Sequence, residues 1–213
     1  MKITIVYDNE ARKVGLRKGH GFSALIEDVG LSPLLFDAGA DGPALLHNMR
    51  ELNINPQEIS IIVISHAHGD HTGGLSEILG VNKIAALYLP SSFKKAFPDR
   101  RVTVVKGPVQ IRENIFSTGE LEETEQSLAL KTDKGIFVLT GCAHPGIGNI
   151  FSTAVKFGRL YGIAGGFHKF REFEAFRGLS LICPCHCTAH KQEIGDLFKN
   201  ETLECGAGLV IEL

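Results

Sequence analysis

Hydrophobic residues along the chain fall into short runs rich in valine, isoleucine and leucine, separated by glycine, asparagine, aspartate and proline. Runs of this kind, bounded by turn residues, are typical of β-strands. The run at 59–64 is apolar at all but one position, which predicts a strand buried on both faces. The pattern predicts strands at 2–7, 21–27, 33–36, 59–64, 86–89, 102–105, 111–117, 127–132, 136–139, 160–164, 179–183 and 209–213.

Helical spacing appears between several of these runs. A helix at 44–52 follows Asp41-Gly42-Pro43, and Asn55-Pro56 has the cap-then-proline form of a short helix start. Further helices are expected at 92–97, at 148–157, at 189–199 and from Leu75 onward. Strands come first and strand–helix alternation follows, which favours two packed sheets with helices outside them, in a single domain over residues 1–213.

Composition narrows the class of protein. The 213 residues are 44% hydrophobic, enough for one substantial core, and the formal net charge is −2, so no nucleic-acid or membrane partner is expected. No apolar run is long enough to span a bilayer, and the first residues read as a strand and not as a targeting signal. Five cysteines, an odd number, do not suggest a disulfide framework, so a reducing cytoplasm is expected. A small-molecule substrate is the expected partner, and a homo-oligomer is left open.

The strongest chemical signal is His66-Ala67-His68-Gly69-Asp70-His71, directly after the predicted buried strand. Imidazole and carboxylate together suit zinc and other divalent ions, and imidazole binds metal near neutral pH at little protonation cost. The alternative is a polar surface loop that is rich in histidine. Three histidines and an aspartate in six positions favour a metal site.

This His-x-His-x-Asp-His spacing resembles the metallo-β-lactamase superfamily. Further segments resemble it in the same order, namely 35–39 with Asp37, 140–144 with His144, and 185–187 with His186. The resemblance implies an α/β fold, the αββα sandwich, with two divalent metal ions; zinc is expected, and manganese and iron are alternatives. The resemblance implies that His66, His68 and His144 bind the first metal. It implies that Asp70, His71 and His186 bind the second. Asp37 would hold the histidine loop in place through hydrogen bonds.

One departure concerns the bridging aspartate that many dinuclear members supply. The corresponding segment here reads Ile163-Ala164-Gly165-Gly166-Phe167-His168 and contains no aspartate. His168 stands near that place, as a ligand, an acid–base group or a substrate contact.

Segments 141–149, 165–168, 186–191 and 20–23 are similar to the branch of dihydropterin ribofuranosyl-aminobenzene phosphate synthases, many of which carry a general hydrolase label. The branch implies a hydrolase or related transferase acting on a small phosphorylated or ester substrate through a metal-activated water, with a link to pterins. Asp70 would orient the water and His168 would donate the proton to the leaving group. Candidate substrate or anion contacts are His20, Gly146, Asn149, His190 and Lys191. The alternatives are an iron-dependent redox enzyme of the same fold and a non-catalytic ligand-binding sensor.

Three of the five cysteines alternate along the chain, as Cys183, Cys185 and Cys187. In an extended strand Cys185 and Cys187 would share the face opposite His186. Because the spacing matches no Cys-x-x-Cys site, buried thiols beside a metal pocket are favoured over a thiolate zinc or iron–sulfur site. Cys142 and Cys205 are expected in the core.

Overall fold

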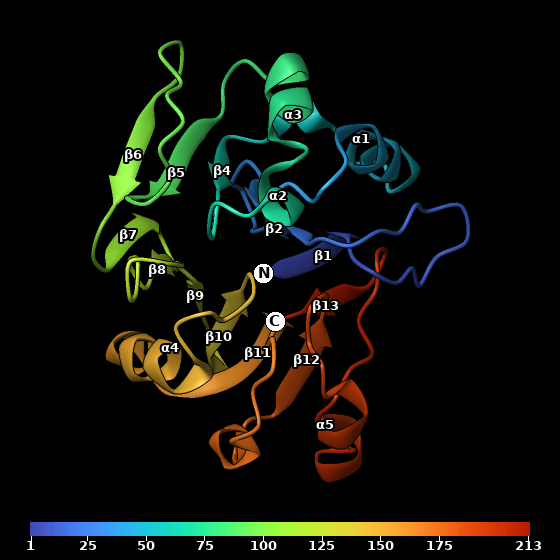
Figure 1. Cartoon of the computed structure of the whole chain (residues 1–213), viewed down its shortest axis with the longest axis vertical. Coiled ribbons are helices and arrows are strands. Elements are labelled where there is room, and N and C mark those ends of the chain that lie inside the picture. Colours follow the sequence, from blue (N-terminus) through green and yellow to red (C-terminus); the bar gives the residue numbers. More distant parts are fainter. The chain divides into compact units, whose positions relative to one another are not determined.

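A computed structural model describes all residues 1–213 and divides them into two compact units. The first unit comprises Met1–Val104 and Cys205–Leu213, and the second comprises Val105–Glu204. Each unit is built around one mixed β-sheet, and Figure 1 labels most of the strands. The single domain expected over residues 1–213 stays a prediction.

The sheet of the first unit has seven strands in the order β13-β1-β2-β3-β4-β5-β6. The strands are β1 (Lys2–Tyr7), β2 (Ser23–Glu27), β3 (Leu34–Phe36), β4 (Ile61–Val63), β5 (Ala86–Pro90), β6 (Val102–Val105) and β13 (Val210–Glu212). Strands β3, β4 and β5 run parallel, with Leu35 opposite Ile62 and Ile62 opposite Leu87.

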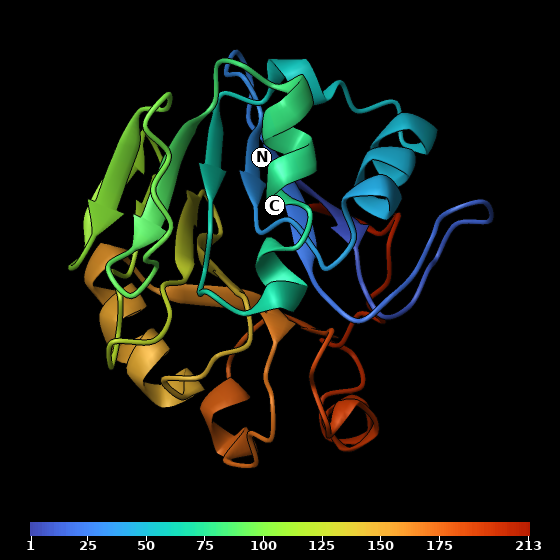
Figure 2. The ribbon, with the colours of Figure 1, turned by 45° about the horizontal axis from the view of Figure 1, so that its top comes forward.

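Helices α1 (Gly42–Glu51) and α3 (Leu75–Val81) cover one face of this sheet (Figure 2). The carboxylate of Asp41 caps α1 by accepting from the Ala44 N–H at 2.7 Å, and proline lies in the first turn as expected. Leu45 of α1 and Ile78 of α3, both fully buried, pack with the strand side chains in one apolar cluster. A short 3₁₀ helix, η1 (Pro56–Glu58), and a single-turn helix, α2 (Gly69–Thr72), complete the unit.

The sheet of the second unit has six strands in the order β12-β11-β10-β9-β8-β7. They are β7 (Val109–Arg112), β8 (Ile115–Ser117), β9 (Leu128–Thr132), β10 (Gly135–Thr140), β11 (Leu160–Gly166) and β12 (Leu181–Cys185). Helices α4 (Ile147–Ala154) and α5 (Lys191–Leu197) and the 3₁₀ helices η2 (Val155–Phe157) and η3 (Phe173–Phe176) accompany it. Ile150, Phe176 and Ile194 from three of these helices share an apolar cluster with Val138 and Ile163 of the sheet.

Parallel strands bring the loops that follow them to one edge of a sheet, and that edge is where such sheets place their sites. In the first unit, Asp37 follows β3 and His66 lies three residues beyond β4. In the second unit β10, β11 and β12 are parallel, and the loops after them carry His144, His168 and His186.

Two predicted elements are wrong. The single strand expected at 111–117 is the hairpin β7–β8, because Asn114 takes the left-handed conformation (φ 62°) and reverses the chain. The helix expected at 92–97 does not form. Phe93 and Phe97 stack at 6.2 Å and pack against the core from an irregular loop, so their spacing of four reflects shared burial.

The other predicted elements are present with small shifts at their ends, including the β9–β10 hairpin at Asp133-Lys134-Gly135. No helix combines the length and the apolar character that a membrane crossing requires.

Candidate metal centre

A buried carboxylate organises the histidine motif of the first unit. Asp37, fully buried and in the left-handed conformation (φ 59°), follows β3. Its Oδ1 accepts from the Ser65 N–H at 2.7 Å, and its Oδ2 accepts from the Ser65 hydroxyl and from His71 Nδ1, both at 2.7 Å. Asp37 therefore ties together the two ends of the segment that carries the motif, as the family resemblance implies.

This network fixes which ring nitrogens can receive a metal. His71 Nδ1–H donates to Asp37, so His71 Nε2 carries the lone pair. His66 Nδ1 lies 2.9 Å from the Ser65 hydroxyl, which already gives its proton to Asp37 and so accepts from His66. Both histidines thus present Nε2 as a lone-pair donor, the arrangement that metal-binding histidines obtain from a hydrogen-bonded carboxylate.

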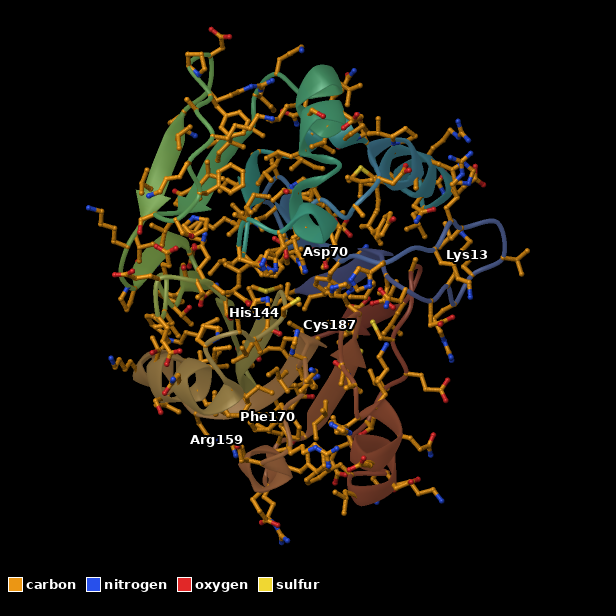
Figure 3. The ribbon with its side chains drawn as sticks, viewed as in Figure 1. Lys13, Asp70, His144, Arg159, Phe170 and Cys187 are labelled. Carbon is orange, nitrogen blue, oxygen red and sulfur yellow. The ribbon has the colours of Figure 1, made fainter.

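The donor atoms of this unit fit a divalent ion. His66 Nε2 and His68 Nδ1 lie 3.0 Å apart, close to the separation of about 3.3 Å for two nitrogens on one tetrahedral zinc ion. His71 Nε2 lies 3.6 Å from Asp70 Oδ2, and both residues belong to α2, where Figure 3 labels Asp70. Three imidazoles and one carboxylate match the ligand chemistry of zinc.

His20 reaches the same cluster from a loop before β2. Its Nε2 lies 3.3 Å from Asp70 Oδ2, with the side chain 69% exposed. Gly21 has φ +146°, and a Cβ there would lie 2.5 Å from the Asp70 carbonyl oxygen. Position 21 therefore requires glycine, because the loop approaches α2 closely there. The same loop places the exposed imidazole of His20 beside Asp70.

Tyr7 lies beneath these loops. A Cβ at Gly39 would lie 2.8 Å from the Tyr7 ring, and a Cβ at Gly21 would lie 3.1 Å from it. Burial, and to a smaller extent the charge of Asp41, raises the pKa of Tyr7, so its hydroxyl stays neutral and the residue acts as an apolar support.

In the second unit the loops after three parallel strands carry the other predicted histidines. Ala143, His168 and His186 take positive φ values of 57°, 47° and 42°. Such conformations are unfavourable for residues other than glycine and concentrate at functional sites. The rings of His144 and His168 lie 5.2 Å apart between centroids.

Hydrogen bonds hold these three loops to one another. The Gly166 N–H donates to the Gly141 carbonyl at 3.0 Å. The Thr188 hydroxyl donates to the Cys185 carbonyl at 2.7 Å and accepts from the Phe167 N–H at 3.0 Å. The second unit therefore presents His144, His168 and His186 on a cross-linked edge.

Sequence reasoning missed Glu125, which is 1% exposed. Its Oε1 accepts from the N–H groups of Gly141, Cys142 and Ala143 at 2.9, 2.9 and 3.0 Å, and its Oε2 accepts from the His144 N–H at 3.0 Å. Glu125 thus clamps the loop that carries His144, a role parallel to that of Asp37. Several acidic residues surround it in the sequence, and only its place just before the buried run at 127–132 could have singled it out.

Cys185 and Cys187 do not share a face as they would in an extended strand. Cys183 and Cys185 lie on one side of β12 with sulfurs 3.8 Å apart, and the left-handed His186 ends the extended run before Cys187. The Cys187 sulfur lies instead 3.3 Å from that of Cys142. Figure 3 labels Cys187 and His144 in this unit.

The other candidate anion contacts have acidic neighbours. Gly146 precedes α4, and Asn149 Nδ2 donates to Glu122 Oε1 at 2.6 Å. His190 Nδ1 lies 3.0 Å from Glu193 Oε1, and Lys191 begins α5. An anion contact at these residues stays a prediction.

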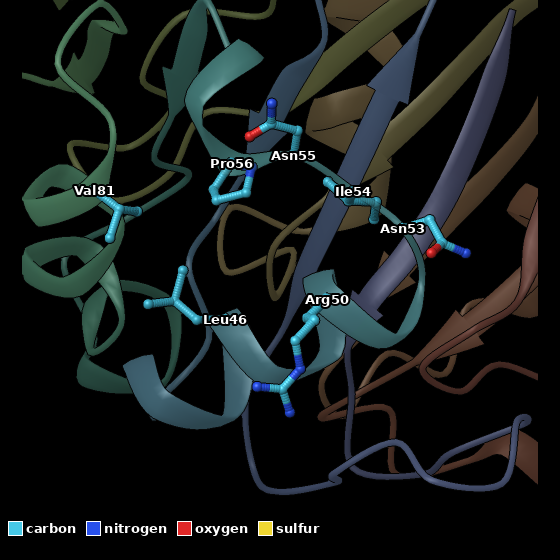
Figure 4. A pocket seen from close by; sticks show the side chains of 7 residues that line it. All are labelled: Leu46, Arg50, Asn53, Ile54, Asn55, Pro56 and Val81. Carbon is cyan, nitrogen blue, oxygen red and sulfur yellow. The ribbon is translucent and has the colours of Figure 1, made fainter.

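A pocket of about 550 Å³ lies elsewhere in the first unit, between α1, η1 and α3 (Figure 4). Its lining is mostly apolar and amide side chains, with Arg50 as the charged group. It contains no histidine, cysteine or carboxylate, so it is not a metal site.

Comparison with known proteins decides the family. The sequence pattern of the metallo-beta-lactamase superfamily matches residues 16–148, which is more than half of the chain. The chain belongs to the metallo-β-lactamase superfamily. Its fold is the metallo-β-lactamase fold, with two mixed sheets and flanking helices, as the resemblance implies.

Individual superfamily members are similar over nearly the whole chain. A 7,8-dihydropterin-6-methyl-4-(beta-D-ribofuranosyl)-aminobenzene-5'-phosphate synthase of Methanocaldococcus jannaschii is 28% identical, covering 91% of this chain and 90% of the relative. A crystal structure of a metal-dependent hydrolase of the β-lactamase superfamily aligns with a TM-score of 0.80 at 27% identity, over 100% of this chain and 99% of that one. The metallo-β-lactamase fold protein YhfI of Bacillus subtilis aligns with a TM-score of 0.74 at 12% identity, over 100% and 98% of the two chains, which supports the fold alone.

Proposed function

We propose that this chain is a metal-dependent hydrolase that acts on a small phosphorylated or ester substrate. The observation that carries the proposal is the buried Asp37 network, which leaves Nε2 of both His66 and His71 as lone-pair donors. The superfamily membership and the similarity to a metal-dependent hydrolase support it.

We further propose that the chain binds two divalent ions, zinc above all. The proposed ligands are His66, His68, Asp70, His71, His144 and His186. Divalent ions held by such ligands supply Lewis-acid polarisation of the substrate and a hydroxide nucleophile at neutral pH.

The protein's own groups have separate roles in this proposal. Asp70 orients the attacking water, and His20 at 3.3 Å supports its carboxylate. His168, exposed and beside His144, donates a proton to the leaving-group oxygen. Asp37 and Glu125 touch neither water nor substrate and act by holding the ligand-bearing segments.

A second candidate is a synthase that handles a pterin-linked ribosyl phosphate. It is favoured by the similarity to the Methanocaldococcus jannaschii synthase over nine-tenths of both chains. The proposal of a phosphorylated substrate rests on that relative's name. The start of α4 does not support it independently, because Asn149 there donates to the carboxylate of Glu122.

The test is hydrolysis by zinc-loaded protein of p-nitrophenyl phosphate, bis(p-nitrophenyl) phosphate and p-nitrophenyl acetate. Turnover should require metal and should be abolished in His66→Ala and Asp70→Ala, which lose a proposed ligand. Lys13→Ala, an exposed change on a distant loop of the same unit, is the matched control. Wild-type rates in both His66→Ala and Asp70→Ala would refute the hydrolase.

Two other classes give different outcomes. An iron-dependent redox enzyme would yield iron and an optical spectrum after anaerobic purification, without hydrolysis. A sensor would bind a pterin or phosphorylated ligand and leave it unchanged over long incubation.

A further inference from the structure

Cys142 stands between the two predicted metal-binding histidines of the second unit. Its sulfur lies within 4.8 Å of a ring nitrogen of His144 and within the same distance of a ring nitrogen of His186. It is 3% exposed, so it does not face bulk water. We propose that Cys142 is itself a metal ligand, through its sulfur, in the centre that contains His144 and His186. This inference rests on the proposed function and adds a soft donor to its ligand set.

The distances suit shared coordination. With zinc bonds of about 2.3 Å to sulfur and about 2.0–2.1 Å to nitrogen, the two donors on one tetrahedral ion lie about 3.6 Å apart. The sulfur of Cys142 lies within 4.8 Å of each ring nitrogen, so each of these distances needs to shorten by about 1 Å at most. Small changes in the side-chain torsions provide such a shift. Because the limit holds for both His144 and His186, the sulfur can share an ion with either.

The backbone around Cys142 is built to hold this position. Its N–H donates to Glu125 Oε1 at 2.9 Å, together with the N–H groups on either side of it. Ala143, left-handed at φ 57°, turns the chain between Cys142 and His144. One carboxylate therefore fixes the sulfur and the imidazole together.

The neighbouring residues make room for sulfur and donate to it. A Cβ at Gly166 would lie 2.6 Å from the Cys187 sulfur and 3.2 Å from Cys142 Cα, so only glycine fits there. Gly166 belongs to the segment in which a bridging aspartate is missing. The sulfurs of Cys187 and Cys142 lie 3.3 Å apart, so the Cys187 thiol can donate to a Cys142 sulfur that binds a metal ion.

Other thiols of the chain behave differently. The Cys185 thiol donates to the Cys183 carbonyl at 3.2 Å, as an ordinary buried thiol does. The Cys205 sulfur lies 3.6 Å from Asp8 Oδ2. Cys142 is thus distinguished from these three cysteines by its imidazole neighbours, since the cluster of Cys183, Cys185 and Cys205 contains no histidine.

The test is the absorption spectrum of protein loaded with Co²⁺. A ligating sulfur gives a sulfur-to-cobalt charge-transfer band in the near ultraviolet, which nitrogen and oxygen ligands do not give. Wild type should show this band, Cys142→Ser should lose it, and Cys187→Ser should keep it, because serine at 187 still donates to Cys142. We also expect Cys142→Ser to bind cobalt at least about tenfold more weakly, the lower bound for residues that merely hold a ligand.

The outcomes separate this inference from the proposed function. Cobalt bound by wild type without the band overturns the role of Cys142 and leaves the hydrolase standing. A band that survives in Cys142→Ser, or that disappears only in Cys187→Ser, also overturns it. Wild type that takes up no cobalt overturns both. If Cys142→Ser does not fold, Cys142→Ala takes its place with the same expected loss of the band, and a wild-type spectrum without the band overturns the inference in either case.

Discussion

Glu125→Gln is the change that tests most sharply how the second unit holds its histidines. Glutamine has the size of glutamate but replaces one carboxylate oxygen with an NH₂ donor. If its oxygen keeps the three N–H groups of 141–143, its amide nitrogen faces the His144 N–H, and that bond is lost. The three remaining bonds lose the charge of their acceptor.

The magnitude follows from these contacts. A lost hydrogen bond to a charged group costs about 1.5–3 kcal/mol, and each of the other three weakens by about 0.5–1 kcal/mol. A buried amide costs less desolvation than a buried carboxylate, which offsets part of the loss, so we expect a net destabilisation of about 2–4 kcal/mol. This is a large share of the roughly 5–15 kcal/mol that stabilises a typical protein.

The assay is urea unfolding followed by circular dichroism, with zinc affinity measured against a chromophoric chelator. Glu123→Gln, an exposed change two positions away, should alter stability by no more than about 0.5 kcal/mol. Zinc binding in Glu125→Gln should weaken by about 10–100-fold if the loop carries a ligand. An unchanged unfolding midpoint would refute the clamp, and a lower midpoint with unchanged zinc affinity would refute its link to the metal.

Three other predictions concern residues near the proposed metal ligands of each unit. Asp37→Asn should weaken zinc binding by about 10–100-fold. The control Asp41→Asn keeps a good helix cap and should bind zinc as wild type does. Equal zinc affinities of the two variants in a chelator competition would contradict this prediction. His168→Ala should leave the metal content unchanged and slow the hydrolysis of phenyl phosphate by about 10²–10⁴-fold. Hydrolysis of p-nitrophenyl phosphate should slow less, because only the poor leaving group, phenolate, needs a proton. Loss of a metal ion in the variant would make His168 a ligand instead. Gly21→Ala should destabilise the protein by about 1–3 kcal/mol in urea unfolding, because its Cβ would meet Asp70 O at 2.5 Å, whereas Gly69→Ala, with nothing within 4 Å, should be neutral or slightly stabilising.

The histidine motif could be predicted from the sequence because its spacing is local, whereas the role of Asp37 was predicted only from the resemblance to the superfamily. The spacing of His66 to His71 after a buried strand is local, and Asp37 ends another recognisable strand. His144 and His186 were predicted from the order of superfamily-like segments along the chain, and their roles as ligands stay predictions. The sequence could not reveal that Ser65 relays the Asp37 contact to His66, since that depends on tertiary geometry.

The failures share a physical cause, which is tertiary context overriding a local pattern. Phe93 and Phe97 have helical spacing but are buried from a loop. Asn114 adopts a left-handed turn inside an apparently continuous strand, and His186 does the same after β12. Glu125 looks like any surface acid until the fold buries it under four N–H groups.

The proposed metal centre is tested most directly by zinc content per chain in elemental analysis, after removal of bound metal with a chelator and reconstitution. We compare wild type with His71→Ala, whose imidazole is held by Asp37 and fully buried. We expect about two zinc ions per wild-type chain and at most about one in the variant, with hydrolysis restored by zinc only in wild type. A wild-type chain that retains no zinc after reconstitution would contradict the metal centre and the hydrolase built on it.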